Sequence, residues 1–196
     1  SVVVLYWKKF FNFKNSAFYV KLIVAVLPAL VLGYLFADKI DALLESPTTV
    51  AISTLVGGVI LVLVDHLFNK PIIQQEKEIS IANAFIIGFW QVIAMIPGVS
   101  RSAASIVGGM QQKLDRSVAA EFSFFLAVPT LCAATGYKLL KAFNQTPAIL
   151  QDYHNIITLS MGSAVAFIVA LLAIKFFIGF LQKHGLKLFG WYRIIV

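Results

Sequence analysis

Residues 97–105 read Pro-Gly-Val-Ser-Arg-Ser-Ala-Ala-Ser, and they interrupt an otherwise apolar region at about 81–110. The leading proline and glycine break a helix, and Ser100 or Ser102 can cap the helix that begins next. The region is therefore predicted to form two half-length helices joined by a turn, rather than one continuous helix.

The composition around this stretch is that of an integral membrane protein. Of the 196 residues, 60% are hydrophobic and 13% are charged, and the mean hydropathy is +0.87. Soluble domains carry roughly 25% charged residues, and a soluble fold of this size has too small an interior to bury so much apolar surface. The net charge of +7 does not indicate a nucleic-acid partner, because the basic residues gather beside apolar stretches.

Four other apolar stretches approach the length of about 20 helical residues that a bilayer requires. With the broken region they predict an all-α polytopic membrane protein that forms a single transmembrane domain over residues 1–196. Gly57 and Gly58 in the second stretch permit close approach of another helix. The predicted spans are about 20–36, 50–64, 119–140 and 156–181, and the interrupted region is 81–110.

The charges between the spans predict that the region at 81–110 is re-entrant. Residues 1–21 carry four lysines and no acid, so this segment is expected inside. A single full span at 81–110 would place Lys113 and Arg116 outside, whereas a re-entrant pair keeps them inside. Two loops, 37–49 and 142–155, carry an excess of acids and are expected outside. Their acidic residues are Asp38, Asp41, Glu45 and Asp152.

Arg101 is the predicted centre of a binding site within the membrane. An arginine at this depth costs roughly 2.5–3.5 kcal/mol to insert, and an anion is the natural partner to offset that cost. Free backbone N–H groups after Gly98 and a guanidinium that binds two oxygens at once suit a phosphate. Ser102 and Ser105 share a helix face, so their hydroxyls are expected to complete the anion shell. The alternative is that Arg101 extends to the interface and the serines only help helices to pack.

Three other polar residues are weaker candidates. Gln91, on the preceding half-helix, either faces the same cavity or hydrogen-bonds another helix. Glu121 and Ser123 open the fourth span and are candidate supports of the site. Glu121 either favours its helix N-terminus, which is the preferred interpretation, or pairs with Arg101 or Arg116.

The sequence shows no metal-ligand spacing, no Ser-His-Asp grouping, no Walker-type phosphate loop and no Gly-x-Ser-x-Gly motif. The residues alone therefore predict an intramembrane anion site, suited to phosphate, without an identified nucleophile or general base.

Both ends of the chain are predicted to lie inside helices. Residues 1–7 (SVVVLYW) have the character of the last turns of a membrane helix, and residues 191–196 (WYRIIV) that of the first turns of another. Neither is long enough to span a bilayer. The chain is therefore expected to be part of a longer protein.

Residues 88–109 (GFWQVIAMIPGVSRSAASIVGG) resemble the second motif, Pro-Gly-x-Ser-Arg-Ser-x-x-Thr, of the undecaprenyl-diphosphate phosphatases of the bacitracin-resistance family. Ser105 stands where the family usually has threonine, and Ala103 stands where it commonly has glycine. The resemblance continues, in the family's order, at 28–33 (PALVLG), 114–116 (LDR), 119–124 (AAEFSF), 127–129 (AVP) and 191–193 (WYR).

The resemblance implies a multi-pass enzyme of the bacterial inner membrane, built from inverted repeats with two re-entrant helix pairs that meet near the midplane. Such an enzyme hydrolyses undecaprenyl diphosphate to undecaprenyl phosphate and inorganic phosphate, which recycles the carrier lipid for peptidoglycan synthesis and confers bacitracin resistance. The site is expected to face the periplasm. The implied partners are the polyprenyl diphosphate and membrane lipids, and association into a homo-oligomer is left open.

Carried onto this chain, the resemblance makes Arg101 and Ser100 the predicted catalytic residues. Gln91 matches the position that pseudo-symmetry pairs with a glutamate of the family's first motif. A divalent cation, magnesium or calcium, is implied by the resemblance alone. The predicted substrate-binding residues are Ser102, Ser105, Gly98 and Gln91.

The family's first motif, a glutamate pair followed by Pro-Val-Ser-Ser-Thr-Gly-His, does not occur in these residues. The groups that the family uses to bind metal and to attack phosphorus are therefore expected upstream of Ser1. By itself this chain is predicted to have no diphosphatase activity.

Two other functions share some of these features. A polyprenyl-phosphate transporter or flippase would need the same anion clamp and is built from broken helices, but it would need no general base. A structural membrane subunit leaves the buried arginine unexplained. Glutamates and a histidine in the upstream segment would favour hydrolysis over transport.

Overall fold

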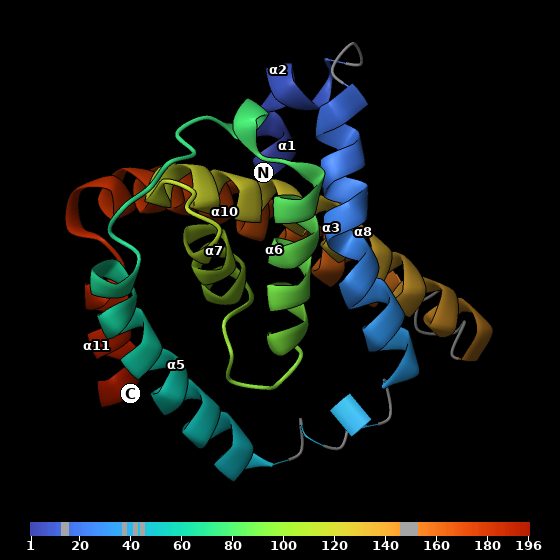
Figure 1. Ribbon diagram of the computed structural model, residues 1–196. Helices are drawn as coiled ribbons and strands as arrows, with labels where there is room; N and C mark the ends of the chain where they lie inside the picture. Colours follow the sequence, from blue (N-terminus) through green and yellow to red (C-terminus); the bar gives the residue numbers. More distant parts are fainter. Residues whose placement is uncertain (13–15, 37–38, 41–42, 44–45, 146–152) are drawn as a thin grey trace.

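The computed structural model describes residues 1–12, 16–36, 39–40, 43, 46–145 and 153–196, which are almost entirely helical (Figure 1). The β structure among these residues is limited to one bridge between Ile73 and Leu114. The elements are α1 (Val2–Leu5), α2 (Trp7–Phe10), α3 (Ser16–Leu35), α5 (Pro47–Leu67), the 3₁₀ turn η1 (Glu76–Glu78), α6 (Ile81–Ile93), α7 (Arg101–Gln111), α8 (Arg116–Gln145), α10 (Tyr153–His184) and α11 (Lys187–Ile195).

Within the described part of the chain, four helices are long and apolar enough to cross a membrane, namely α3, α5, α8 and α10. They coincide with the four predicted spans to within a few residues at each end. The prediction of an all-α polytopic membrane protein is therefore confirmed. The acids that place two loops outside, Asp38, Asp41, Glu45 and Asp152, lie outside the described residues.

The predicted break at 81–110 is present, because α6 has 13 residues and α7 has 11. Both are too short to span a bilayer. The N–H groups of Ile72 and Ile73 donate to the carbonyl of Lys113 at 2.8 and 3.0 Å, and Asp115 N–H donates to the Ile73 carbonyl at 2.7 Å. The segment that enters α6 and the segment that leaves α7 are thus joined, so both ends of this antiparallel pair lie on the same side of the molecule (Figure 1).

The core lies where α3, α6, α7 and α8 pack together. Ala25, Ile87 and Phe122 contribute fully buried side chains from three of these helices, and Ile106 contributes one from α7. A Cβ added to Gly88 would lie 2.7 Å from the Ala25 carbonyl carbon, so α3 and α6 touch backbone to backbone. This contact packs the short helix α6 directly on the membrane-spanning helix α3, and it so fixes the broken region in the bundle.

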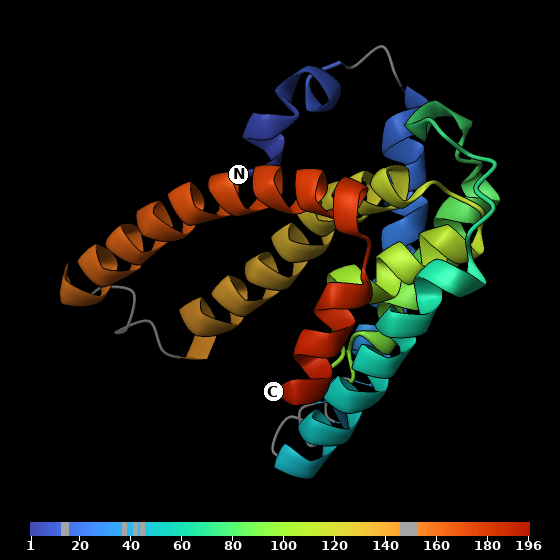
Figure 2. The same cartoon turned by 90° about the vertical axis from the view of Figure 1, so that its left-hand side faces the viewer.

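The helices α5 and α11 form a second packed unit, side by side in both views (Figures 1 and 2). A Cβ on Gly190 would lie 2.7 Å from the Gly58 carbonyl oxygen, and one on Gly58 would lie 2.9 Å from that of Gly190. The predicted close approach at Gly58 is confirmed. Asp65 of α5 contacts both this unit and the bundle. Its Oδ2 accepts from Leu186 N–H at the start of α11 at 2.8 Å, and its Oδ1 lies 3.6 Å from Nε of Arg116 in α8, which ties the unit to the bundle.

The longest helix, α10, runs beside α8 and away from the core (Figure 2). Only 11% of its most apolar window is buried, against 39% for α8. Such a surface is compatible with lipid and not with water.

Candidate functional site

The turn between α6 and α7 is built by Pro97, Gly98 and Ser100. Pro97 has no N–H with which to continue a helix, and Gly98 has a φ of +88°, in the region that favours glycine. Ser100 then caps α7, because its Oγ accepts from Ala103 N–H at 3.3 Å. The predicted break is confirmed, and the cap is Ser100 rather than Ser102.

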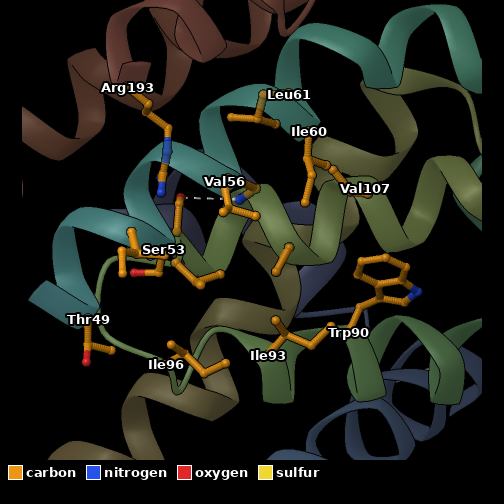
Figure 3. A pocket seen from close by; sticks show the side chains of 16 residues that line it. Thr49, Ser53, Val56, Ile60, Leu61, Trp90, Ile93, Ile96, Val107 and Arg193 are labelled. Carbon is orange, nitrogen blue, oxygen red and sulfur yellow. Dashed lines mark hydrogen bonds between the residues drawn. The ribbon is translucent and has the colours of Figure 1, made fainter. Parts of the chain in front are cut away.

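The hydroxyls of Ser100 and Ser102 lie together at the start of α7, with 3.2 Å between their Oγ atoms. Both residues line a cavity of about 220 Å³ that also contacts Tyr192 and Arg193 of α11. Ser100 further lines a larger cavity of about 500 Å³ (Figure 3), whose other walls are mainly apolar side chains of α5, α6 and α7. The Ser100 and Ser102 hydroxyls therefore lie in the smaller cavity together with Tyr192 and Arg193, and Ser100 also borders the larger, mainly apolar cavity.

Arg101 is the first residue of α7, and its Nη1 is buried. This nitrogen has no hydrogen-bond partner among the residues that the structure describes. A buried charged donor left unsatisfied is destabilising by more than the 1–3 kcal/mol or so typical of a neutral group. The N-terminus of α7 adds partial positive charge beside it. Arg101, like Ser105 and Gln91, lines neither of the two cavities at Ser100. Burial of Nη1 argues against an interfacial arginine, an unpaired buried cation favours an anionic acceptor, and contact of Arg101 with substrate stays a prediction.

Ser105 lies on the far side of α7 from these cavities, against α8. It is fully buried, and its Oγ lies 2.6 Å from that of Ser123. Ser105 donates to the Arg101 carbonyl at 2.9 Å, which leaves Ser123 as the donor to Ser105. Ser105 and Ser123 thus join α7 to α8 directly behind Arg101, and Ser105 lines neither of the two cavities that Ser100 lines. Its contact with substrate stays a prediction.

Gln91 is 2% exposed and faces α8. Its Nε2 donates to the Thr130 Oγ1 at 3.2 Å, which is the interhelical hydrogen bond of the second interpretation. Its Oε1 is buried and has no partner among the described residues. Gln91 lines neither cavity at Ser100, and its role in substrate binding stays a prediction.

Glu121 does not pair with Arg101 or Arg116, and this alternative from the sequence was wrong. The preferred interpretation was wrong as well, because α8 begins at Arg116 and Glu121 lies beyond its first turn. Its Oε2 lies 3.5 Å from the Nζ of Lys9, from the segment before the first span. Arg116 instead faces Asp65 of α5. A lysine more than a hundred residues away in sequence cannot be found from local spacing, whereas Arg116 was the nearest cation in the chain.

Arg193 is a residue that the sequence analysis did not assign to the site. It extends from α11 toward α5 (Figure 3), and it lines both cavities. The sequence did contain a signal for it, because Arg193 lies inside the apolar run at 191–196. An arginine in such a run is costly at membrane depth, which is the argument that singled out Arg101.

In the ranges that the structure describes, no three His, Cys, Asp or Glu side chains come together in a way that could hold a metal ion. Ser100, Ser102 and Arg101 offer hydroxyls and a cation, which do not suit a divalent cation. The residues of this site therefore do not fit a metal, and no chemical step is derived through one.

The fold and the site together define an integral membrane protein with a broken helix pair, at whose turn lie two neighbouring hydroxyls and a buried arginine nitrogen without an acceptor among the described residues. The family model of the bacitracin resistance protein BacA matches residues 1–196, and the chain belongs to this family.

Curated relatives match the whole chain. The undecaprenyl-diphosphatase of Flavobacterium psychrophilum is 60% identical over 195 residues, covering 100% of this chain and 72% of that protein. The undecaprenyl-diphosphatase of Flavobacterium johnsoniae is 57% identical over 196 residues, with the same two shares. That of Porphyromonas gingivalis is 47% identical over 213 residues, covering 100% of this chain and 75% of that protein.

Proposed function

We propose that this chain supplies the phosphate-binding part of an enzyme that hydrolyses undecaprenyl diphosphate to undecaprenyl phosphate and inorganic phosphate. The observation that carries the proposal is the buried Nη1 of Arg101, which has no acceptor among the described residues and lies at the N-terminus of α7. Membership of the BacA family and relatives named undecaprenyl-diphosphatase support hydrolysis and do not favour the flippase alternative.

Arg101 would grip the diphosphate through its guanidinium, which presents parallel N–H donors to two oxygens at once. Ser100 and Ser102 stand next to it with hydroxyls that can donate to a further oxygen. Hydrogen-bond donors held in place in a site of low dielectric stabilise the charge that develops as the phosphoryl group is transferred. The role of these three residues is binding and charge stabilisation.

The substrate class follows from the surroundings of Ser100. The larger cavity beside it is lined by Val56, Ile60, Trp90 and other apolar side chains of α5, α6 and α7. An apolar cavity with the Ser100 hydroxyl at its wall, next to the smaller cavity that Ser100 and Ser102 both line, suits a phosphorylated lipid better than a soluble phosphate ester. This supports a polyprenyl diphosphate as the ligand.

The proposal assigns no proton transfer to these residues. Among the described residues that line the two cavities at Ser100, none is a histidine or a carboxylic acid. The attack on phosphorus, and the binding of any divalent cation, are therefore assigned to residues other than those that line these two cavities.

We place the protein in the bacterial inner membrane, with the site on the outer side. Lysines at both ends of the α6–α7 pair support an inward position of those ends, because basic residues favour the inner face. The Pro97–Gly98 turn lies at the opposite end of the pair (Figure 1). The turn thus points toward the outer half of the bilayer.

The test is release of phosphate from undecaprenyl diphosphate by the full-length protein in detergent. Arg101→Ala and Arg101→Lys are each expected to lower kcat/KM about 100-fold or more, because lysine keeps the charge and loses the two-pronged contact. Lys138→Ala, which removes an exposed lysine of α8, is the matched control and is expected to leave the rate unchanged.

Rates within about threefold of the unmodified protein for both Arg101 variants would overturn the assignment of the site. Absence of phosphate release from well-folded protein, with lipid binding that still needs Arg101, would overturn hydrolysis in favour of transport.

A further inference from the structure

Three side chains from α5 and α11 hold the carbonyls of the Pro97–Gly98 turn. Arg193 Nη2 and Thr54 Oγ1 both donate to the Gly98 carbonyl, the latter at 3.5 Å. Ser53 Oγ donates to the Pro97 carbonyl. Carbonyls in a turn between two broken helices have no helical partner, so each would otherwise be buried without a donor. The turn is thus secured from outside the α6–α7 pair.

Arg193 joins two elements through one guanidinium. Besides its bond to Gly98, its Nε donates to the Thr54 carbonyl of α5 at 3.4 Å. A Cβ added to Gly57 would lie 3.0 Å from Arg193 Nη2, so this glycine leaves the path open for the side chain. A planar group with donors on two edges can make both contacts, whereas a lysine ammonium cannot span them.

The secured turn directly precedes the anion site. Gly98 is two residues before Ser100, the cap of α7, and three before Arg101. A shift of the turn moves the start of α7, and with it the hydroxyls and the guanidinium that face the ligand. Figure 3 shows Arg193 extending from α11 toward the part of α5 that carries Ser53, across the cavity from Ile93 and Ile96.

We infer that Arg193 is a positioning residue of the anion site, which fixes the Pro97–Gly98 turn so that Arg101 and Ser100 meet the phosphates in register. This inference rests on the proposed function. Arg193 acts through the turn, because its Nε and Nη2 are already committed to carbonyl oxygens. Arg101 differs, since its Nη1 is unpaired within the described residues.

The test compares kcat and KM of Arg193→Lys and Ser53→Ala in the full-length protein, with undecaprenyl diphosphate as substrate. Because misplacement of a catalytic group lowers the rate more than the binding, kcat is expected to fall about tenfold in Arg193→Lys and about threefold in Ser53→Ala. KM is expected to change less than about threefold in both. Lys187→Ala, an exposed lysine of the same helix α11, is the control and should match the unmodified protein.

A double-variant cycle separates positioning from general damage to the fold. In the Arg101→Lys background the two-pronged contact is already lost, so Arg193→Lys is expected to lower kcat less than about threefold further. A merely structural role would lower kcat by the same factor in both backgrounds. A direct phosphate ligand would instead raise KM about tenfold or more with little change in kcat. Either result overturns the inference.

Failure of this inference is distinguishable from failure of the proposed function. Collapse of activity in Arg101→Ala together with normal kcat in Arg193→Lys would overturn only the positioning role. Should Arg193→Lys not fold, Ser53→Ala carries the test, and unchanged kcat in that variant would also overturn the role. Full activity in Arg101→Ala would remove the site on which both statements depend.

Discussion

Two arginines in this protein lie near the same turn, and they differ in whether their guanidinium groups are hydrogen-bonded. Arg193 is bound to carbonyl oxygens of Thr54 and Gly98, whereas Arg101 has a buried nitrogen without an acceptor among the described residues. Both would be costly at membrane depth if left unpaired. Under the proposed function, the satisfied arginine belongs to the scaffold, and the unsatisfied one is the group expected to bind the phosphates.

The residue-scale prediction concerns Gly98, whose φ of +88° and contacts both demand glycine. In Gly98→Ala a Cβ would lie 2.5 Å from the Val50 carbonyl oxygen and would also collide with Ser53 Oγ. We expect the free energy of unfolding to fall by about 2 kcal/mol and phosphate release to fall at least about tenfold. Thermal unfolding in detergent and the phosphate assay measure the two effects.

Gly136→Ala is the matched control for Gly98→Ala. Gly136 lies in α8, where an added Cβ meets no atom within 4 Å, and alanine favours a helix over glycine by about 1 kcal/mol. Its melting temperature should stay the same or rise. An equal loss of stability in both variants would show that the turn has no special need for glycine.

The helix break, the serine cap and the burial of Arg101 could be predicted at the residue scale, but the partners of several residues could not. Arg101 and the serine cap follow from the local pattern of a helix break, a hydroxyl and a buried charge. The partner of Glu121 is Lys9, and the partner of Gln91 is Thr130, both from other helices. Such pairs depend on how helices pack, which spacing along one segment does not contain.

At the scale of elements, the site depends on two units that meet at the Pro97–Gly98 turn. One unit is the core of α3, α6, α7 and α8, and the other is the pair α5–α11, which brings Ser53, Thr54 and Arg193 to the turn. The four full-length spans were predictable because length and hydropathy alone define them. The pairing of α5 with α11 was not, since α11 is short and its partner is distant in the sequence.

The element-scale prediction concerns the packing of α5 on α11. Gly58→Leu would force the two backbones apart, because a Cβ alone would already lie 2.9 Å from the Gly190 carbonyl oxygen. We expect the free energy of unfolding to fall by about 3 kcal/mol, and activity to fall with it as Arg193 leaves the turn. Thermal unfolding in detergent and phosphate release test this.

Gly162→Leu is the control for the packing prediction, because an added Cβ at Gly162 of α10 meets no atom within 4 Å. Its free energy of unfolding is expected to stay the same or to rise by up to about 1 kcal/mol, because leucine favours a helix over glycine. A similar melting temperature for the two variants would contradict a close α5–α11 contact.

At the scale of the whole molecule, the re-entrant pair explains how the basic residues can satisfy one membrane topology. The hydrogen bonds from Ile72, Ile73 and Asp115 join the two ends of the pair on one side of the molecule, which is the arrangement that a re-entrant pair requires. The charge pattern of the sequence predicted this arrangement, although it contains no information on the contact that secures it. If residues 81–110 formed one full span in place of the re-entrant pair, α8 and α10 would cross the membrane in the opposite direction.

The last prediction tests this topology directly with single cysteines in a background where Cys132 is replaced by serine. Lys70→Cys and Lys113→Cys, exposed positions at the two ends of the pair, are expected to react with a membrane-impermeant maleimide only in inverted vesicles. Gln145→Cys, at the far end of α8, is expected to react only in intact cells or right-side-out vesicles, because α8 crosses the bilayer once. Labelling of Lys70→Cys and Lys113→Cys from opposite sides would contradict the re-entrant pair, and it would move the Pro97–Gly98 turn, with Arg101, from a tip inside the membrane to the middle of a continuous crossing.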